Sequence, residues 1–364
     1  MASSPLILAA LAKSIFPSGN FKQAKSIVTD GPVNFESAIL TDSDGIQSIV
    51  RASKSAKGNL ELATDTQAVR AVKSSGTLPF NLPNLVAEGT GPRGNTVQIV
   101  DFIYGTHLEF EDLNPDDVII SSLGRSLASI HSLDREAISR SGMPNRSASE
   151  IRDLRISELD RAASTGRVPA TLLQRWESAL EDIDLFRFQP TVIHGNFIGA
   201  NVLELGEEVS GVISWSNLCI GDPAEDFVAF AALQNPETLA AVKASYLENI
   251  SDLDTNLVPR SVLYSELAVA SYLVSSISNS NQDEADWAAS ELETISALVE
   301  DGSAMTLGPI SFTGASALIL SEDIELETGN HLVIPEEVNK DEIDVSDLKT
   351  RPIELPSKQD DQLF

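Results

Sequence analysis

The polar residues that could carry chemistry gather in one stretch of the chain, between residues 191 and 227. A short apolar run leads there into a polar loop, a second apolar run follows, and a hairpin returns the chain to another loop. Two short strands arranged in this way would present several side chains together at one end. The polar residues concerned are His194, Asn196, Asn201, Ser214, Asp222 and Asp226. Their types and spacing predict a functional site.

The order of these residues resembles the catalytic segment of the aminoglycoside and macrolide phosphotransferases, a protein-kinase-like family. The family pattern reads His-Gly-Asp, five residues to Asn-Val-Leu, then Ile-Asp-Trp and Gly-Asp-Pro-x-x-Asp. This chain reads His194-Gly195-Asn196, Asn201-Val202-Leu203, Ile213-Ser214-Trp215 and Gly221-Asp222-Pro223-Ala224-Glu225-Asp226. The resemblance covers about residues 5 to 300 and implies an α+β fold with two lobes, a small antiparallel sheet and a mainly helical lobe.

Asn196 stands where the family places the carboxylate that accepts or orients the hydroxyl group of the acceptor. Phosphoryl transfer depends mostly on positioning and charge, and this carboxylate serves as its general base. An amide is neutral and does not accept a proton near neutral pH. Loss of a general base typically removes about two to four orders of magnitude in rate. The resemblance therefore marks Asn196 as a degenerate catalytic position.

The metal-binding positions of the family are only partly retained. Asn201 keeps the family's asparagine and its spacing, and the resemblance implies that it holds a metal ion. Ser214 replaces the second metal ligand, an aspartate, with a neutral hydroxyl. Because magnesium is usually held by one or two carboxylates together with phosphate, Ser214 should weaken metal binding. The family implies ATP or GTP with magnesium as the cofactor, and Ser214 weakens the case for the metal.

The supporting residues of the family's loop are present. The resemblance implies that His194 packs beneath the loop as a scaffold and that Asp226 supports the loop by bonding to its backbone. Asp222 and Asp226 are the carboxylates that remain near the loop, and Asp226 would need a changed loop path to serve as a base. His131, in an apolar helical stretch, is interpreted as a packed core histidine rather than a base. The residues that support the loop are therefore retained, whereas the residues at the base position and at one metal position are replaced.

In a kinase-like small lobe, a strand cation reaches the nucleotide phosphates and a helix carboxylate pairs with it. The resemblance assigns these roles to Arg51 and Asp65; an exposed strand charge and a solvated helix charge are the alternatives. Aspartate is one methylene shorter than the family's glutamate, so a strained or absent ion pair is expected. The resemblance also implies a hinge that reads a purine edge, at Asp101-Phe102-Ile103-Tyr104. A strand that leads into a loop explains that stretch equally well.

The elements that must position these residues follow from hydrophobic periodicity. Strands are expected at residues 25–28, 35–40, 46–52 and 96–104, with a turn at residues 42–45. A helix is expected at residues 60–72, where one face is formed by Leu62, Ala63, Val69 and Val72. Further helices are expected at residues 148–163, 170–186, 236–249, 259–278 and 283–299.

The composition is that of a soluble protein with an unusually acidic balance. The chain has 364 residues, 42% of them apolar, and a net charge of −29. That charge argues against binding to nucleic acid or to an anionic membrane, because both need basic surface. The single cysteine, Cys219, excludes an intramolecular disulfide framework and fits a reducing cytoplasm. The apolar run in residues 1–12 is too short to span a membrane and lacks the basic start of a signal peptide, so a cytoplasmic location is expected.

The chain divides into three expected regions. Residues 1–104 form the expected N-terminal lobe, and residues 105–300 form the expected helical lobe with the segment at residues 191–227. Residues 301–364 are expected to be a largely disordered acidic tail, since residues 321–364 contain 13 acidic and 4 basic residues. The tail is interpreted either as an arm that binds a protein partner or as a solubilising extension.

Three functional hypotheses follow. A pseudokinase would bind a nucleotide, another small molecule or a protein partner without efficient catalysis. An active ATP- or GTP-dependent phosphotransferase would act on a small molecule of the aminoglycoside or macrolide type and use a rearranged carboxylate. A scaffold would act only through the acidic tail. The loss of both carboxylates, at Asn196 and Ser214, favours the pseudokinase.

Overall fold

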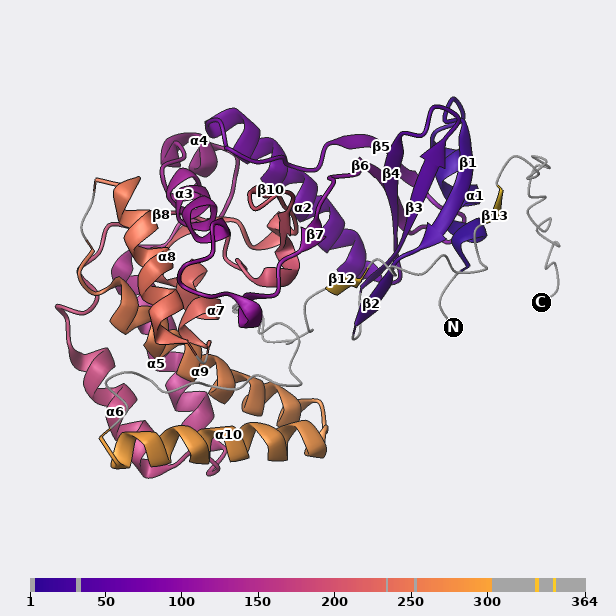
Figure 1. Ribbon diagram of the computed structural model, residues 1–364. Helices are drawn as coiled ribbons and strands as arrows, with labels where there is room; N and C mark the ends of the chain where they lie inside the picture. Colours follow the sequence, from indigo (N-terminus) through magenta and orange to yellow (C-terminus); the bar gives the residue numbers. More distant parts are fainter. Residues whose placement is uncertain are drawn as a thin grey trace, which may run out of the picture.

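The chain folds into two lobes of different composition (Figure 1). The computed structural model describes residues 4–30, 34–233, 235–251, 254–302, 331–333 and 343–344. An antiparallel sheet dominates the smaller lobe and helices dominate the larger one, which confirms the expected two-lobed α+β fold. Most of the expected acidic tail lies outside the described residues.

The sheet of the smaller lobe has the strand order β13-β1-β3-β4-β6-β5, and all neighbours are antiparallel. Its strands are β1 (Phe21–Ser26), β3 (Phe35–Asp42), β4 (Gln47–Ser53), β5 (Leu85–Thr90), β6 (Thr96–Asp101) and β13 (Ile343–Asp344). A separate pair joins β2 (Val28–Asp30) to β12 (His331–Val333). The turn expected at residues 42–45 is confirmed, with Gly45 at a φ of 80°. The strand expected at residues 96–104 ends early, at Asp101.

Alternation of side chains along the central strands gives the sheet two different faces. Ala38 and Leu40 of β3 and Val50 of β4 are buried in one cluster with residues of helix α1 (Pro5–Ile15). The intervening residues of the same strands line a cleft on the other face, namely Phe35, Ser37, Ile39, Ile49 and Arg51. One face of the sheet therefore builds a core, and the other faces the candidate site.

The larger lobe is mainly helical. Its helices are α3 (Ile119–His131), α4 (Arg135–Arg140), α5 (Ala148–Ser164), α6 (Ala170–Glu181), α7 (Val228–Ala231), α8 (Pro236–Glu248), α9 (Leu257–Ser278) and α10 (Gln282–Glu300). Between them lie short strands, β7 (Thr106–His107), β8 (Thr191–Ile193), β9 (Val202–Glu204), β10 (Val209–Val212) and β11 (Cys219–Gly221). Single turns of 3₁₀ helix complete the lobe, η1 (Phe110–Asp112), η2 (Gly199–Asn201), η3 (Trp215–Asn217) and η4 (Pro223–Phe227). Within the described part of the chain, every helix is too short or too polar to cross a membrane.

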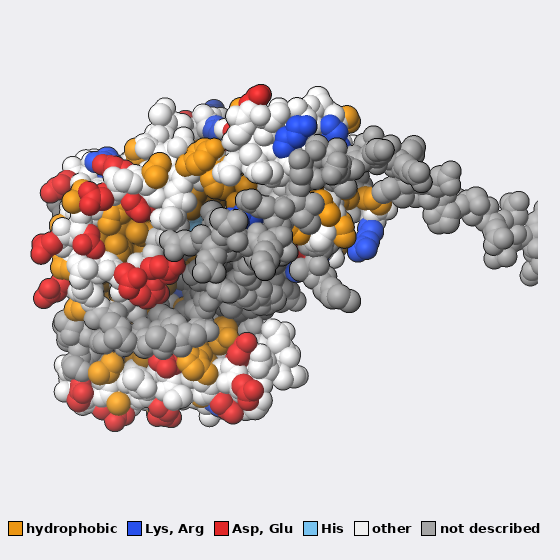
Figure 2. Space-filling model, turned by 45° about the vertical axis from the view of Figure 1, so that its right-hand side comes forward, with side chains coloured by type: hydrophobic (Ala, Val, Ile, Leu, Met, Phe, Trp, Pro, Cys, Tyr) orange, Lys and Arg blue, Asp and Glu red, His pale blue; other side chains and the backbone are white. Residues whose placement is uncertain are grey.

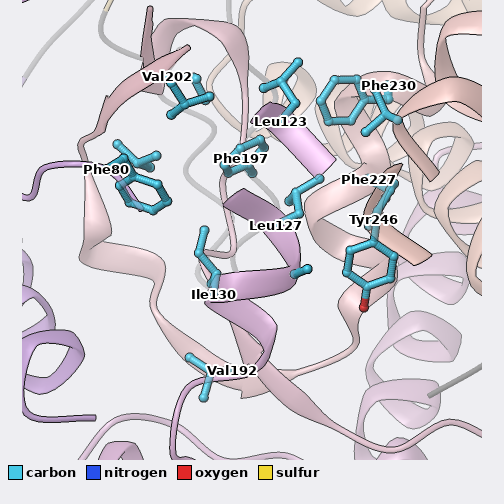
Figure 3. Packing of buried hydrophobic residues seen from close by; sticks show 14 of the residues in the cluster. Phe80, Leu123, Leu127, Ile130, Val192, Phe197, Val202, Phe227, Phe230 and Tyr246 are labelled. Atoms are coloured by element: carbon cyan, nitrogen blue, oxygen red, sulfur yellow. The ribbon is translucent and has the colours of Figure 1, made fainter. Parts of the chain in front are cut away.

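Two hydrophobic clusters hold the larger lobe together. One surrounds α3 and includes Leu123, Leu127 and Phe230, which lie close together in Figure 3. The other lies between α5, α6, α9 and α10 around the buried Trp176 and Tyr264. The first cluster also contains apolar residues within or next to the polar loops, namely Val192 of β8, Phe197, Val202 of β9 and Trp215 of η3. The loops of the candidate site are therefore built directly on a packed core.

Helix α2 (Ala56–Ser75) connects the two lobes. Although it follows β4 in the chain, its residues Val69 and Val72 pack in the first cluster of the larger lobe. The expected apolar face was wrong at one position, because Ala63 is exposed and Asp65 is buried instead. A buried carboxylate needs partners from other elements, and a periodic apolar pattern does not reveal them.

Candidate functional site

Strand β8 leads into the loop that contains His194, Gly195 and Asn196. Gly195 has a φ of 76°, in the left-handed region. A Cβ atom there would lie 2.5 Å from the backbone oxygen of Asn217. Both observations require glycine, which adopts this conformation without steric cost. The loop is thereby held against the segment that follows Trp215.

The buried carboxylate of Asp226 anchors this loop. Its Oδ1 accepts a hydrogen bond from the Gly195 amide and its Oδ2 one from the His194 amide, each at 2.8 Å. His131 Nε2 lies 3.1 Å from Oδ2, and it donates, because an ionised carboxylate can only accept. Asp226 therefore meets three donors, and His131 is a buried partner of this anchor rather than an exposed base.

His194 is buried beneath the loop and is neutral. Its Nδ1 accepts a hydrogen bond from the Asn196 amide at 3.2 Å, so the proton lies on Nε2, which donates to the Ile213 carbonyl at 3.0 Å. Burial lowers the pKa of His194 below its ordinary value, against the attraction of Asp226. Because both ring nitrogens are engaged by the backbone, His194 is placed as a support for the loop.

Asn196 and Asn201 are linked through the loop backbone. The Nδ2 of Asn201 donates to the backbone oxygen of Asn196 at 3.0 Å. This bond leaves Asn201 Oδ1 as the atom that could meet a ligand. The Oδ1 of Asn196 is buried without a hydrogen-bond partner among the described residues. An unsatisfied buried oxygen costs about 1–3 kcal/mol, and Asn196 is not among the residues that line the cleft.

Ser214 adopts a left-handed backbone conformation, with φ of 64° and ψ of 57°. Residues other than glycine, asparagine and aspartate rarely do so, at a cost of roughly 1–2 kcal/mol. The amide of the next residue, the buried Trp215, donates to Asp65 Oδ1 at 2.8 Å and holds the turn in place. Ser214 lines the cleft. The backbone therefore still brings this position to the cleft, although the carboxylate has been replaced.

Asp222, the other carboxylate near the loop, is fully engaged behind it. Arg260 donates to it twice, from Nε to Oδ2 at 2.7 Å and from Nη2 to Oδ1 at 2.9 Å. Tyr264 donates to Oδ2 at 2.6 Å, and the Ala224 amide donates to Oδ1 at 2.9 Å. Asp222 and Arg260 are both buried. Asp222 therefore caps η4 and anchors α9, and it cannot reach the loop at Asn196 without breaking these bonds.

A cluster of buried charges continues from Asp222 toward α5. Arg155 pairs with Glu158 and with Glu225, each at 2.9 Å, and its guanidinium lies 4.4 Å from the centre of the Tyr264 ring. Burial raises the pKa of Glu225 to about 7, and the negative charge of Asp222 adds to the rise while Arg155 opposes it. This cluster ties α5 and α9 to η4.

The cleft collects most of the residues that the resemblance assigns to nucleotide binding. Its lining includes Arg51, Asp101, Phe102, Ile103 and Ser214. Tyr104 is 56% exposed and packs edge-on against Phe102. Outside the strand ladders, the backbone groups of Phe102 and Ile103 make no hydrogen bond within the described ranges. Apolar walls with a few convergent polar groups are typical of small-molecule sites.

Arg51 and Asp65 form an ion pair with Nη1 and Oδ2 at 2.8 Å. The expectation of a strained or absent pair was therefore wrong. The shorter carboxylate is within reach because α2 packs into the larger lobe, where Asp65 also binds the Trp215 amide. Arg51 Nη2 donates to Gln98 Oε1 at 3.1 Å, and its Nε is buried without a partner in the described part of the chain. Arg51 is thus held rigidly while one donor stays unused.

The donors at the family's metal positions do not fit magnesium. Asn201 offers an amide oxygen and Ser214 a hydroxyl, whereas Asp222 and Asp226 are occupied by other groups. The described residues contain no group of three or more His, Cys, Asp or Glu side chains that could hold a metal ion. Magnesium usually needs one or two carboxylates besides phosphate. The donor set therefore disagrees with the metal that the family implies.

The surface of the larger lobe is acidic. On the face shown in Figure 2, Asp and Glu side chains are spread over this lobe, in agreement with the net charge of −29. Such a surface repels phosphate, but salt screens the repulsion beyond about 8–10 Å. A local cation is therefore decisive for an anionic ligand, and Arg51 is the arginine in the cleft lining.

Three residues that shape the site were not assigned to it from the sequence. Gln98 is fully buried within the apolar strand β6, and a polar residue in such a run signals hydrogen-bond partners elsewhere. Tyr264 lies in α9, for which the sequence predicted only a helix at residues 259–278. Arg260 reaches Asp222 across 38 positions of sequence, and no local pattern predicts that pairing.

Comparisons with known structures agree with this geometry. The chain is similar to the apoenzyme of macrolide 2′-phosphotransferase MphH from Brachybacterium faecium, with a TM-score of 0.61 and 18% identity, covering 72% of this chain and 90% of that one. It is also similar to the GDP complex of wild-type aminoglycoside 2′-phosphotransferase-IIIa, with a TM-score of 0.66 and 20% identity, covering 81% and 99% of the two chains. At these identities the likeness shows a shared fold.

Sequence comparisons lead to the same family. An uncharacterized protein of Bacillus subtilis (strain 168), YcbJ, is 23% identical over 192 residues, which cover 49% of this chain and 63% of YcbJ. The model of the phosphotransferase enzyme family matches residues 40–255, more than half of the chain, and includes the whole segment at residues 191–227. The chain therefore belongs to the phosphotransferase enzyme family.

Proposed function

We propose that this protein is a catalytically impaired phosphotransferase that binds a purine nucleotide in the cleft between its lobes. Arg51 lines the cleft together with Phe102 and Ile103 of the hinge stretch. In this arrangement the hinge backbone reads the edge of the base and Arg51 meets the phosphates. A structure of the same fold, that of aminoglycoside 2′-phosphotransferase-IIIa, contains GDP, which supports the choice of ligand.

The observation that carries the impairment is the amide of Asn196 at the position of the family's base. Asn201 Nδ2 holds the Asn196 backbone, so the loop keeps its path while the reacting carboxylate is missing. An amide cannot take the proton of an acceptor hydroxyl near neutral pH. The loss of that proton acceptor typically lowers the rate by about two to four orders of magnitude.

A rearranged carboxylate is the alternative that would preserve activity. Asp226 meets three donors and Asp222 meets four, and both side chains are buried. Freeing either one would leave buried donors unpaired, at about 1–3 kcal/mol for each group. The geometry therefore favours impairment over a substituted base. The protein partner expected for the acidic tail and the cytoplasmic location stay predictions.

The nucleotide proposal is tested by thermal unfolding of the full chain with ATP, ADP, GTP and GDP. We expect one of these nucleotides at millimolar concentration to raise the unfolding temperature of wild type, because a ligand that binds only the folded state stabilises it. Arg51→Ala should remove most of this rise. Arg161→Ala, which removes an exposed arginine of α5, is the matched control and should keep it.

Failure of all four nucleotides to move the unfolding temperature would refute nucleotide binding. Impairment is tested separately, by nucleotide consumption with aminoglycoside, macrolide and amino-alcohol acceptors. We expect turnover about two to four orders of magnitude below that of a phosphotransferase with the carboxylate base. Efficient turnover by wild type that is lost in Asp222→Asn would show that the carboxylate has been substituted after all.

A further inference from the structure

The electrostatics of the cleft carry one inference that rests on the proposed function and extends it. Asn196 and Ser214 each place a neutral group where the family has a carboxylate. Relative to the family pattern, the site has therefore lost two negative charges. A magnesium ion carries two positive charges. The two replacements thus change the local charge by the same amount as the metal would.

The remaining carboxylates around the loop do not restore the negative charge. Asp65 is neutralised by Arg51 at 2.8 Å. Asp222 is neutralised by Arg260 at 2.7 Å. Asp226 is buried under two backbone amides and His131 Nε2 and has 0% exposure. None of these carboxylates lines the cleft. Among the described residues, the carboxylate that does line the cleft is Asp101, which belongs to the hinge stretch and whose Oδ2 accepts a hydrogen bond from Asn84 Nδ2 at 2.6 Å.

Donors for an anion are present at the same place. Arg51 lines the cleft, and its Nη1 and Nη2 each carry a second N–H besides the one that bonds to Asp65 or Gln98, whereas its Nε is buried. Ser214 also lines the cleft and can donate its hydroxyl proton, which the aspartate of the family pattern cannot do. A guanidinium and a hydroxyl can bind phosphate oxygens directly.

We infer that this protein binds its nucleotide as the free polyphosphate anion, without a divalent cation. In the family pattern, a divalent cation would offset two carboxylates that otherwise repel the phosphates. Here both carboxylates are replaced, and one of them, at Ser214, is the family's charged metal ligand, so that only the neutral Asn201 remains of the metal ligands. Arg51 and Ser214 take over the contact with the phosphates, and the cleft neither needs nor holds magnesium.

The inference is tested by isothermal titration of the full chain with ATP and ADP, once with excess EDTA and once with magnesium chloride. We expect wild type to bind each nucleotide about tenfold or more weakly in magnesium chloride than in EDTA, because magnesium complexes the nucleotide in solution and competes with a protein that takes only the free anion. Equal dissociation constants in the two buffers would mean that the protein binds the magnesium complex equally well, and they would overturn the inference. Electron paramagnetic resonance spectra, recorded after Mn²⁺ is added to the nucleotide-bound protein, should show no signal from manganese bound to the protein. Binding that requires magnesium overturns the inference and leaves the proposed function intact. No binding in either buffer overturns the proposed function itself.

A charge-restoring variant sharpens the test. Asn196→Asp with Ser214→Asp should weaken ATP binding in EDTA by about tenfold or more, since a carboxylate at position 214 lines the cleft and one at position 196 adds a second negative charge in the loop that His194 ties to Ile213. Magnesium should then recover the affinity. Ser139→Asp with Ser178→Asp, on exposed faces of α4 and α6, adds the same charge outside the cleft and should change neither constant. The comparison of wild type in the two buffers decides the inference even if the charge-restoring variant does not fold.

Discussion

Asp226 holds the loop that contains Asn196, but the two side chains differ in how far their oxygens are satisfied by hydrogen bonds. The carboxylate of Asp226 is consumed by the amides of His194 and Gly195 and by His131. The amide of Asn196 leaves its oxygen buried and unpaired. The polar groups that hold the loop thus have hydrogen-bond partners. The side-chain oxygen of Asn196, at the position of the family's base, has none among the described residues. At the scale of residues, structure is retained and the reacting groups are changed.

The buried Glu225 makes a prediction about pH. In the folded protein the pKa of Glu225 is about 7, whereas its ordinary value is 4.5. Between these values the folded protein binds the additional proton, so its stability is greatest at the acidic end and falls as the pH rises toward 7. One pKa unit corresponds to about 1.4 kcal/mol, which amounts to a loss of about 3 kcal/mol across the window.

The measurement is the free energy of unfolding by urea between pH 5 and 7.5, for wild type and Glu225→Gln. Glutamine lacks the titrating group, so the variant should not show this loss, and its stability relative to wild type should rise with pH. Glu177→Gln, on an exposed position of α6, should follow the wild-type curve. If the difference in free energy of unfolding between wild type and Glu225→Gln stays constant with pH, the raised pKa of Glu225 is contradicted.

At the scale of elements, close contacts between helices restrict which residues can occupy a position. Helix α3 carries the buried Leu123 and Leu127 and packs against α8. The contact is possible because residue 124 is glycine. A Cβ atom at Gly124 would lie 2.4 Å from Ser245 Oγ and 2.6 Å from the Tyr246 amide nitrogen. The glycine thus allows Tyr246 to reach His131, which bonds to the anchor of the loop.

Gly124→Ala should therefore destabilise the protein, although alanine is the better helix former by about 1 kcal/mol. The clash involves backbone and should cost about 1–3 kcal/mol more than this gain, which lowers the unfolding temperature by several degrees in a thermal melt. Ser129→Ala in the same helix is the control, since its hydroxyl bonds only to the Arg125 carbonyl one turn back. Equal unfolding temperatures for the two variants would show that α3 and α8 adjust freely.

At the scale of the whole molecule, Asp65 links the lobes. It binds Arg51 of the sheet through one oxygen and the Trp215 amide of the larger lobe through the other. Helix α2 contributes at the same time to the core of the larger lobe. The cleft is therefore bounded by two lobes that share a buried helix and a buried carboxylate, which favours a stable geometry for Arg51.

Asp65→Ala should weaken this link, because it leaves a buried guanidinium and a buried amide without their partner. We expect the free energy of unfolding to fall by about 3 kcal/mol, measured from the urea midpoint, and the stabilisation by nucleotide to fall with it. Asp160→Ala, on an exposed position of α5, is the matched control and should change stability by less than about 0.5 kcal/mol. Retention of wild-type stability by Asp65→Ala would show that the lobes are held by other contacts.

Most of the architecture could be predicted from local patterns. The spacing from His194 to Asp226 indicated the family and the two-lobed fold, and the apolar periodicity indicated the strands and helices within a few residues. The predicted ends and faces of elements were wrong where tertiary contacts determine them. Strand β6 ends at Asp101, whose side chain accepts a hydrogen bond from Asn84. Ala63 is exposed because Asp65 faces the larger lobe.

The sequence by itself determined which chemical groups are missing, because the identities of Asn196 and Ser214 can be read without any coordinates. Only the tertiary structure decided that the other carboxylates nearby are engaged by buried donors. Asp222 meets Arg260 across 38 positions and Asp65 meets the Trp215 amide across 150. A motif records residue types along the chain, whereas the availability of a carboxylate depends on donors that folding brings to it from distant segments.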